Sequence, residues 1–132
     1  MRQLKRMQTI YILDYDADIA FALCKWFNAH GFEAKSFCTL EQLLKQLAAQ
    51  QPDCIILDCL YGRVSLTSNV CRTFRQVYYY YGNIVLTSTT NLSIKDLQAC
   101  SAAHFIAKPF ELLEVLNVVN NLFKNALAIS VA

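Results

Sequence analysis

The chain has 132 residues, of which 55% are hydrophobic and 17% charged, and its formal net charge is +2. This composition is typical of a compact globular domain and excludes a disordered chain. A net charge of +2 does not indicate nucleic-acid binding, and no apolar run approaches the ~20 residues of a membrane span. The first residues make a poor signal peptide, so we expect a cytoplasmic protein.

The six cysteines form no CxxC pair and have no metal-ligand spacing. Most of them lie within apolar segments, where cysteine packs as a small hydrophobic residue. Cys59 follows an aspartate at the end of an apolar run, and it is the cysteine that we expect to be open to oxidation or alkylation.

Five short apolar segments have the composition of β-strands, at residues 9–13, 33–37, 54–57, 83–87 and 104–107. The segment 54–57 has no alternation of apolar and polar residues. Such an unbroken run is typical of a strand that is buried on both faces of a parallel sheet.

A helix is predicted after each strand, at about residues 16–30, 40–47, 66–78, 93–100 and 111–123. Thr39 with Gln42 indicates the start of the second helix, Ser93 with Asp96 that of the fourth, and Gly31 a stop after the first. We expect a single domain over residues 1–124, with residues 125–132 as a tail or the start of a linker.

The four tyrosines at 78–81 stand at a predicted helix end. We expect one or two of them to pack inside and the others to lie on the surface. A stacking site for a ligand or a nucleic-acid base is the alternative. His30 is expected near a helix C-terminus, where the helix dipole favours it, rather than on a metal.

Strands and helices alternate five times with short connections. This order predicts an α/β fold in which a doubly wound, five-stranded parallel sheet lies between two helix layers. The common form at this length has the flavodoxin-like strand order 2-1-3-4-5.

Polar residues follow four of these strands: Asp14 and Asp16 the first, Asp58 the third, Thr87 the fourth, and Lys108-Pro109 the fifth. In this strand order their side chains meet in one crevice at the carboxyl edge of the sheet. Clustered carboxylates repel one another unless a cation joins them, which indicates Mg²⁺. A lysine and a hydroxyl suit phosphoryl oxygens, so the crevice is suited to transfer of a phosphoryl group onto a carboxylate. The alternative is that a carboxylate at a strand end only caps the following helix.

With these motifs, the chain resembles the receiver domain of two-component response regulators, such as chemotaxis regulators, over about residues 7–124. The matching stretches are ILDYDAD after the first strand, PDCIILD at the third, LTS at the fourth, and Phe105 ahead of Lys108-Pro109-Phe110. They occur in the family's order and near its spacing.

The resemblance implies a signalling switch rather than an enzyme. Asp58 would be the phosphoacceptor that forms an aspartyl phosphate, with a sensor histidine kinase or a phosphotransfer protein as the donor. Thr87 and Lys108 would each bind a phosphoryl oxygen, and a cis peptide before Pro109 would aim Lys108 at the site. Phe105 matches the family's switch aromatic, which turns inward when the threonine moves toward the phosphoryl group.

The same resemblance places the output surface on residues 93–123, which hold the fourth helix, the fifth strand and the fifth helix. This surface would control a partner or an output domain beyond the C-terminus, with transcription as the expected output, and it could also form a homodimer. We expect no direct contact of this domain with nucleic acid or with a membrane.

The chain departs from the family's pattern in three places. Tyr15 stands where the family has a second acid that ligates Mg²⁺, so a metal held by Asp14, Asp16 and Asp58 would be bound weakly or not at all. Tyr61 and Arg63 alter the loop after the third strand, and Ser101 replaces the glycine usual before the fifth. Two hypotheses therefore stay open: a phosphorylated switch, and a pseudo-receiver that binds partners without phosphorylation.

Overall fold

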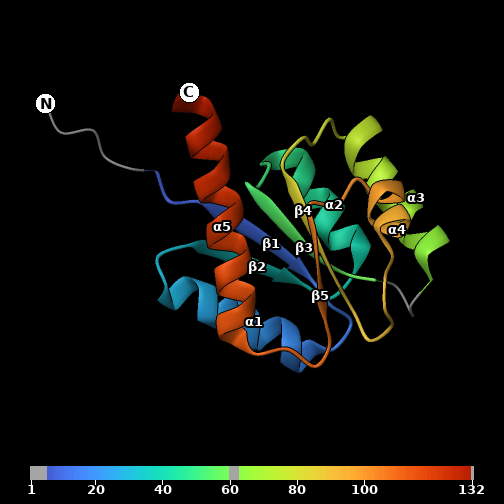
Figure 1. Cartoon of the computed structure of the whole chain (residues 1–132), viewed down its shortest axis with the longest axis horizontal. Coiled ribbons are helices and arrows are strands. Elements are labelled where there is room, and N and C mark those ends of the chain that lie inside the picture. Colours follow the sequence, from blue (N-terminus) through green and yellow to red (C-terminus); the bar gives the residue numbers. More distant parts are fainter. Residues whose placement is uncertain (1–5, 60–62, 132) are drawn as a thin grey trace, which may run out of the picture.

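The computed structural model describes residues 6–59 and 63–131, and for residues 126–131 the backbone alone. The chain forms one parallel sheet with helices on both faces (Figure 1). Tyr61, which the sequence pointed to as a change near the pocket, lies outside the described residues. No helix among the described residues combines the length and the apolar character that a membrane crossing requires.

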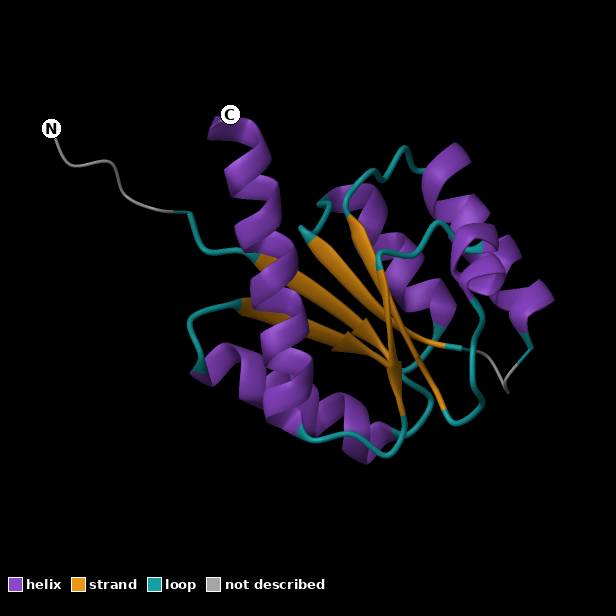
Figure 2. Ribbon diagram, in the orientation of Figure 1, coloured by secondary structure: helices purple, strands orange, loops and turns teal. Residues whose placement is uncertain are grey.

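The five strands lie in the order β2-β1-β3-β4-β5, and every neighbouring pair is parallel (Figure 2). Their bounds are β1 Thr9–Leu13, β2 Glu33–Phe37, β3 Cys54–Asp58, β4 Asn83–Ser88 and β5 His104–Ala107. The predicted fold class, strand order and strand positions are confirmed. All five residues of β1 and the first four of β3 are buried, as their unbroken apolar runs indicated.

The helices are α1 Ala17–Ala29, α2 Leu40–Ala49, α3 Val64–Gln76, α4 Ile94–Ala99 and α5 Leu112–Val131. The predicted bounds of α3 were wrong by two residues at each end. Helix α5 continues through the residues that we expected to be a tail, because no glycine or proline interrupts it. Whether that last part serves as a linker stays a prediction.

Successive strand residues point to opposite faces of the sheet, and this alternation builds two separate cores. On one face Ile10 and Ile12 belong to a core with residues of α1 and α5, and on the other Tyr11 and Leu13 pack with residues of α2 and α3. Figure 1 shows the same division, with α1 and α5 on one side of the sheet and α2, α3 and α4 on the other. The sheet is thus covered on both faces, and its carboxyl edge holds the predicted polar residues.

The predicted N-terminal caps of α2 and α4 and the predicted stop after α1 are present, and α1 has an N-terminal cap, Asp16, that was not predicted. The Asp16 carboxylate accepts from the backbone N–H groups of the first turn of α1, and Gly31 ends that helix with a φ of +88°. The Thr39 hydroxyl caps α2, and Ser93 forms a reciprocal capping box with Asp96 at the start of α4. His30 is the C-terminal cap of α1, as expected, and its Nδ1 lies 2.7 Å from the Trp26 carbonyl oxygen.

The tyrosine run divides as predicted. Tyr80 is 1% exposed and its hydroxyl donates to the Asn83 carbonyl oxygen over 2.8 Å. Tyr79 and Tyr81 are exposed, and Tyr78 is partly buried. One buried ring therefore anchors this loop to the core.

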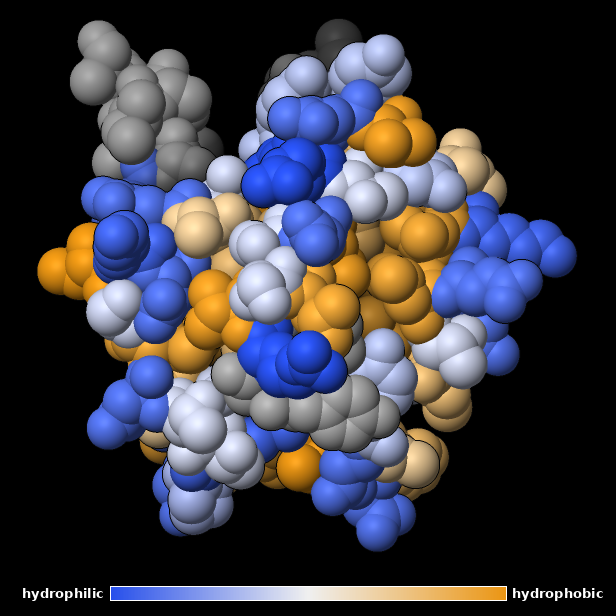
Figure 3. All heavy atoms as spheres, turned by 90° about the vertical axis from the view of Figure 1, so that its right-hand side faces the viewer, coloured by the Kyte–Doolittle hydropathy of each residue, from blue (hydrophilic) through white to orange (hydrophobic). Residues whose placement is uncertain are grey.

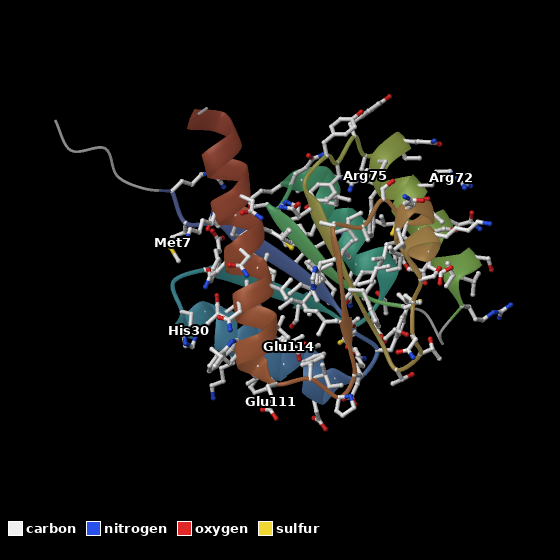
Figure 4. The ribbon with its side chains drawn as sticks, in the orientation of Figure 1. Met7, His30, Arg72, Arg75, Glu111 and Glu114 are labelled. Carbon is white, nitrogen blue, oxygen red and sulfur yellow. The ribbon has the colours of Figure 1, made fainter. Side chains whose placement is uncertain are left out.

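Arg75 ties two loops together near the end of α3. Its guanidinium donates to the carbonyl oxygens of Tyr80 (2.9 Å), Gly82 (2.7 Å) and Ser101 (2.9 Å), and it lies over the Tyr80 ring. Figure 4 shows Arg75 turned into the fold, whereas Arg72, one turn earlier on α3, points outward. The loop before β4 and the loop before β5 thus share one charged donor.

Candidate functional site

The carboxyl ends of β1, β3, β4 and β5 meet at one edge of the sheet (Figure 2). Asp58 ends β3 and stands directly opposite Thr87 of β4, on strands about 4.8 Å apart. Asp14 follows β1, and Lys108 follows β5. The Lys108 backbone N–H donates to the Ser88 carbonyl oxygen over 2.8 Å, which holds this residue against the end of β4.

The Lys108 ammonium joins the two carboxylates of the pocket. Its Nζ lies 2.8 Å from Asp14 Oδ2 and 3.0 Å from Asp58 Oδ1. Asp14 is only 3% exposed, and its second oxygen accepts from the Asp16 backbone N–H over 2.8 Å. A buried carboxylate with both oxygens bonded is a fixed negative charge, so Asp14 holds the ammonium beside Asp58.

Burial and the neighbouring charges change the proton affinities of this pair. Burial raises the pKa of Asp58 above its ordinary value, and the charge of Asp14 adds to this, although hydrogen bonds from Lys108 and from the Tyr15 backbone N–H lower it. Burial lowers the pKa of Lys108, but its hydrogen bonds to the two carboxylates outweigh that effect and raise it. Lys108 is therefore firmly cationic, whereas burial destabilises the negative charge of Asp58.

The Thr87 hydroxyl differs from its neighbours in its hydrogen bonding. Thr87 is 1% exposed, and its Oγ1 has no hydrogen-bond partner in the part of the chain that the structure describes. Ser88, the next hydroxyl along β4, is instead bonded within its loop, to the hydroxyl and the backbone N–H of Thr90. A buried hydroxyl without a hydrogen-bond partner is unfavourable, and the Thr87 hydroxyl can donate to an acceptor that enters the pocket.

The residues predicted to form the switch lie beside this pocket. Phe105 is paired with Leu86 in the sheet and is partly buried. The Lys108–Pro109 peptide bond is cis, as the resemblance implied. Thr87 pairs with Ile106, the residue after Phe105, so Thr87 and Phe105 lie on neighbouring strands.

A family model described as the response regulator receiver domain matches residues 10–120 of the chain. The chain belongs to the response regulator receiver family. Receiver domains are signalling modules rather than conventional enzymes, they pair with histidine kinases, and they typically bind Mg²⁺. No curated protein matches the chain.

Solved receivers share the fold at low sequence identity. A response regulator from Thermotoga maritima is 20% identical, with a TM-score of 0.76, over 90% of this chain and 99% of that one. The chemotaxis response regulator CheY4 of Vibrio cholerae is 18% identical, with a TM-score of 0.75, over 89% of this chain and 99% of that one. NtrX from Brucella abortus is 18% identical, with a TM-score of 0.75, over 96% of this chain but only 28% of its own length. The receiver fold thus occurs both in short chains and within longer ones.

The donor set of this pocket does not fit a tightly bound Mg²⁺. Asp14 and Asp58 reach the pocket, but both are bonded to Lys108, and the Asp16 carboxylate is turned to the N-terminus of α1. Tyr15, which is 45% exposed, offers a phenol in place of a carboxylate. Among the described residues no group of three or more His, Cys, Asp or Glu side chains is placed to hold a metal ion.

The structure brings together four of the predicted site residues, Asp14, Asp58, Thr87 and Lys108. It places the Asp16 side chain at the N-terminus of α1, as the helix cap. Their chemical roles stay predictions. Sequence reasoning missed the Tyr15 backbone N–H, which supports the Asp58 carboxylate. A backbone donor is present at every residue except proline, so no residue type could have indicated it.

Proposed function

We propose that Asp58 accepts a phosphoryl group from a phosphohistidine of a partner protein. The observation that carries the proposal is the arrangement around Asp58: Lys108 Nζ at 3.0 Å, and the buried, unpartnered hydroxyl of Thr87 directly across the sheet. These are a cation and a donor placed where phosphoryl oxygens would lie.

In the proposed step an Asp58 carboxylate oxygen attacks phosphorus, and the bond between phosphorus and the histidine nitrogen breaks. The nitrogen keeps the bonding electrons and is left as imidazole. Lys108 pairs with one phosphoryl oxygen as charge moves onto the acyl phosphate, and the Thr87 hydroxyl donates to another. Asp14 keeps the ammonium in place throughout, since it holds Lys108 independently of Asp58.

The partner approaches over apolar surface beside Lys108. A groove of about 430 Å³ opens there, lined by Ile19, Thr89, Lys108, Pro109 and Phe110. A histidine kinase or a phosphotransfer protein that packs apolar side chains on this groove brings its phosphohistidine to the mouth of the pocket. A cytoplasmic location agrees with such a partner.

The readout follows from the Thr87 hydroxyl. Drawn toward a phosphoryl oxygen, Thr87 leaves space beside β5, and Phe105 turns into it, while Pro109 keeps Lys108 at the site. The surface at residues 93–123 then changes shape and controls an output domain or a partner, with transcription as the expected output, or forms a homodimer. The domain itself makes no contact with nucleic acid.

The test is the intact mass of the protein after incubation with acetyl phosphate, with and without Mg²⁺. One added phosphoryl group is expected on the wild-type protein and none on Asp58→Asn, which keeps the size of the side chain and removes the nucleophile. Equal labelling of the two proteins would overturn the proposal.

A second function is favoured by the residue at position 15. With a phenol in place of an acid, the domain could act as a pseudo-receiver, an interaction module that works without phosphorylation. Tyr15→Asp separates the two functions. If only this variant is labelled, and labelling requires Mg²⁺, the natural chain has lost its metal site and signals by binding alone.

A further inference from the structure

Three buried cysteines lie close together on the side of the sheet that α3 and α4 cover, and the proposed phosphoryl transfer uses none of them. Cys59 follows β3, Cys71 lies in α3, and Cys100 is the C-terminal cap of α4. None is more than 3% exposed. Three oxidisable thiols from three elements make this a candidate site for redox chemistry.

Within this group, Cys71 and Cys100 form the closest association. Both belong to the core between the sheet and α3, and the Arg75 guanidinium, one turn after Cys71, donates to the carbonyl oxygen of Ser101, next to Cys100, over 2.9 Å. Cys59 is near enough for its charge to affect the pKa of Cys71, but its Sγ lies 3.4 Å from the Thr67 hydroxyl and is held there. The geometry therefore favours Cys71 with Cys100 over any pair that includes Cys59.

Cys100 lies at the end of α4, which has no buried side chain, whereas Cys71 is a buried residue within α3. Opening of α4 therefore exposes Cys100 first, so the Cys100 thiolate attacks and Cys71 resolves.

Helix α4 gives an oxidant a route to Cys100. It has six residues and none of its side chains is buried, and Ile94 in its first turn is 76% exposed. Figure 3 looks onto this side of the molecule, where hydrophobic surface lies exposed between hydrophilic residues. The helix is followed by Ser101 at a φ of +51°, which is strained for a residue with a side chain. A short, weakly packed helix opens at low cost, and its opening uncovers Cys100 while α3 still holds Cys71.

We propose that Cys71 and Cys100 are a redox-sensitive pair, which hydrogen peroxide converts to a disulfide that fixes the end of α4 to α3. The Cys100 thiolate attacks one peroxide oxygen, the O–O bond breaks, and Cys100 sulfenic acid forms. The hydroxide that leaves takes up the proton released by the Cys100 thiol and becomes the first molecule of water. The Cys71 thiol then attacks the Cys100 sulfur and expels the second water. Two thiols are oxidised and one peroxide is reduced.

The disulfide would act on the same surface as the proposed switch. Helix α4 begins the output surface at residues 93–123, so a bond from Cys100 to α3 restricts its movement whatever the state of Asp58. Oxidation would thereby hold the domain in its present arrangement of α4. The proposal stands without the phosphoryl transfer, because the chemistry involves neither Asp58 nor Lys108.

The experiment is to treat the folded protein with hydrogen peroxide, alkylate it under denaturing conditions without reductant, and map its tryptic peptides. Residues 64–72 and 96–124 lie on separate peptides, because trypsin does not cleave between Lys108 and Pro109. We expect these two peptides to be joined, the mass to fall by two hydrogens, and the six free thiols to fall to four. Amide exchange of α4 should also slow in the oxidised protein and recover with dithiothreitol.

Three alanine variants complete the test. Cys71→Ala and Cys100→Ala should abolish the joined peptides, and Cys59→Ala, the matched control from the same cluster, should leave them unchanged. The result that overturns the proposal is a disulfide that includes Cys59, or oxidation confined to the exposed Cys38 with no intramolecular bond. Since the wild-type protein already gives the peptide map, the test holds even if one variant fails to fold.

Discussion

Replacement of Thr87 by valine should stabilise the unmodified protein while it damages the proposed function. Valine keeps the shape of threonine but replaces its hydroxyl with a methyl group. That hydroxyl is buried and has no partner in the described part of the chain, and such a group costs about 1–3 kcal/mol. We therefore expect Thr87→Val to raise the free energy of unfolding by about 1 kcal/mol.

Thr67→Val is the matched control. Thr67 is equally buried, but its hydroxyl donates to the Arg63 carbonyl oxygen over 3.1 Å and contacts Cys59 Sγ. Loss of a satisfied hydrogen bond costs about 1 kcal/mol, so this variant should be less stable than the wild type. With an m-value of roughly 2 kcal/mol per M, the urea midpoints of the two variants should differ by about 1 M, in opposite directions from the wild type.

The two variants should also differ in labelling. A hydrogen bond to a charged group contributes about 1.5–3 kcal/mol, so loss of the Thr87 donor should slow phosphorylation from acetyl phosphate by roughly ten-fold or more. Thr67→Val should be labelled at the wild-type rate. If Thr87→Val is destabilised as much as Thr67→Val, the Thr87 hydroxyl has a partner in the unmodified protein and is not waiting for a phosphoryl oxygen.

Three further predictions concern stability. Arg75→Ala should lower the free energy of unfolding by about 2–4 kcal/mol, because it removes three charged hydrogen bonds. Arg72 points outward, so Arg72→Ala should change the free energy of unfolding by less than about 0.5 kcal/mol. Equal effects of the two substitutions in urea titrations would contradict this prediction. Asp58→Asn should be more stable than the wild type at neutral pH. Folding raises the pKa of Asp58, so its carboxyl group stabilises the folded wild-type protein below the unfolded pKa, and this contribution is lost as pH rises through the folded pKa. The stability advantage of Asp58→Asn over the wild type should therefore shrink as pH falls. An advantage that does not change with pH would refute the assigned cause. Ser101→Gly should stabilise the protein by about 0.5–1 kcal/mol in thermal unfolding, since glycine adopts a φ of +51° without strain, and a loss of stability would show that the serine backbone is not strained.

Much of the site could be predicted because the fold itself performs the assembly. Residues as distant as Asp14, Asp58 and Lys108 meet only because parallel strands in the order 2-1-3-4-5 bring their carboxyl ends to one edge. Each strand was visible as a short apolar run, and the order followed from the alternation of strands and helices.

What escaped prediction depends on competition between equivalent groups. An aspartate after a strand can ligate a metal or cap a helix, and only the backbone geometry shows that Asp16 caps α1. The three carbonyl oxygens bound by Arg75 belong to two loops whose approach no local pattern records. The length of α5 was underestimated because its last two turns lack an amphipathic period, although nothing in them interrupts a helix.

The most direct test of the central claim is to locate the phosphoryl group chemically. Sodium borohydride reduces an acyl phosphate to an alcohol, so a phosphorylated aspartate becomes homoserine, which fragmentation of the peptide at residues 46–63 can assign. This peptide also contains Asp53, which is bonded to Arg6 outside the pocket and serves as an internal control. We predict that homoserine forms at Asp58 alone after acetyl phosphate treatment. Homoserine at Asp53 or at another carboxylate, with Asp58 unchanged, would contradict the account.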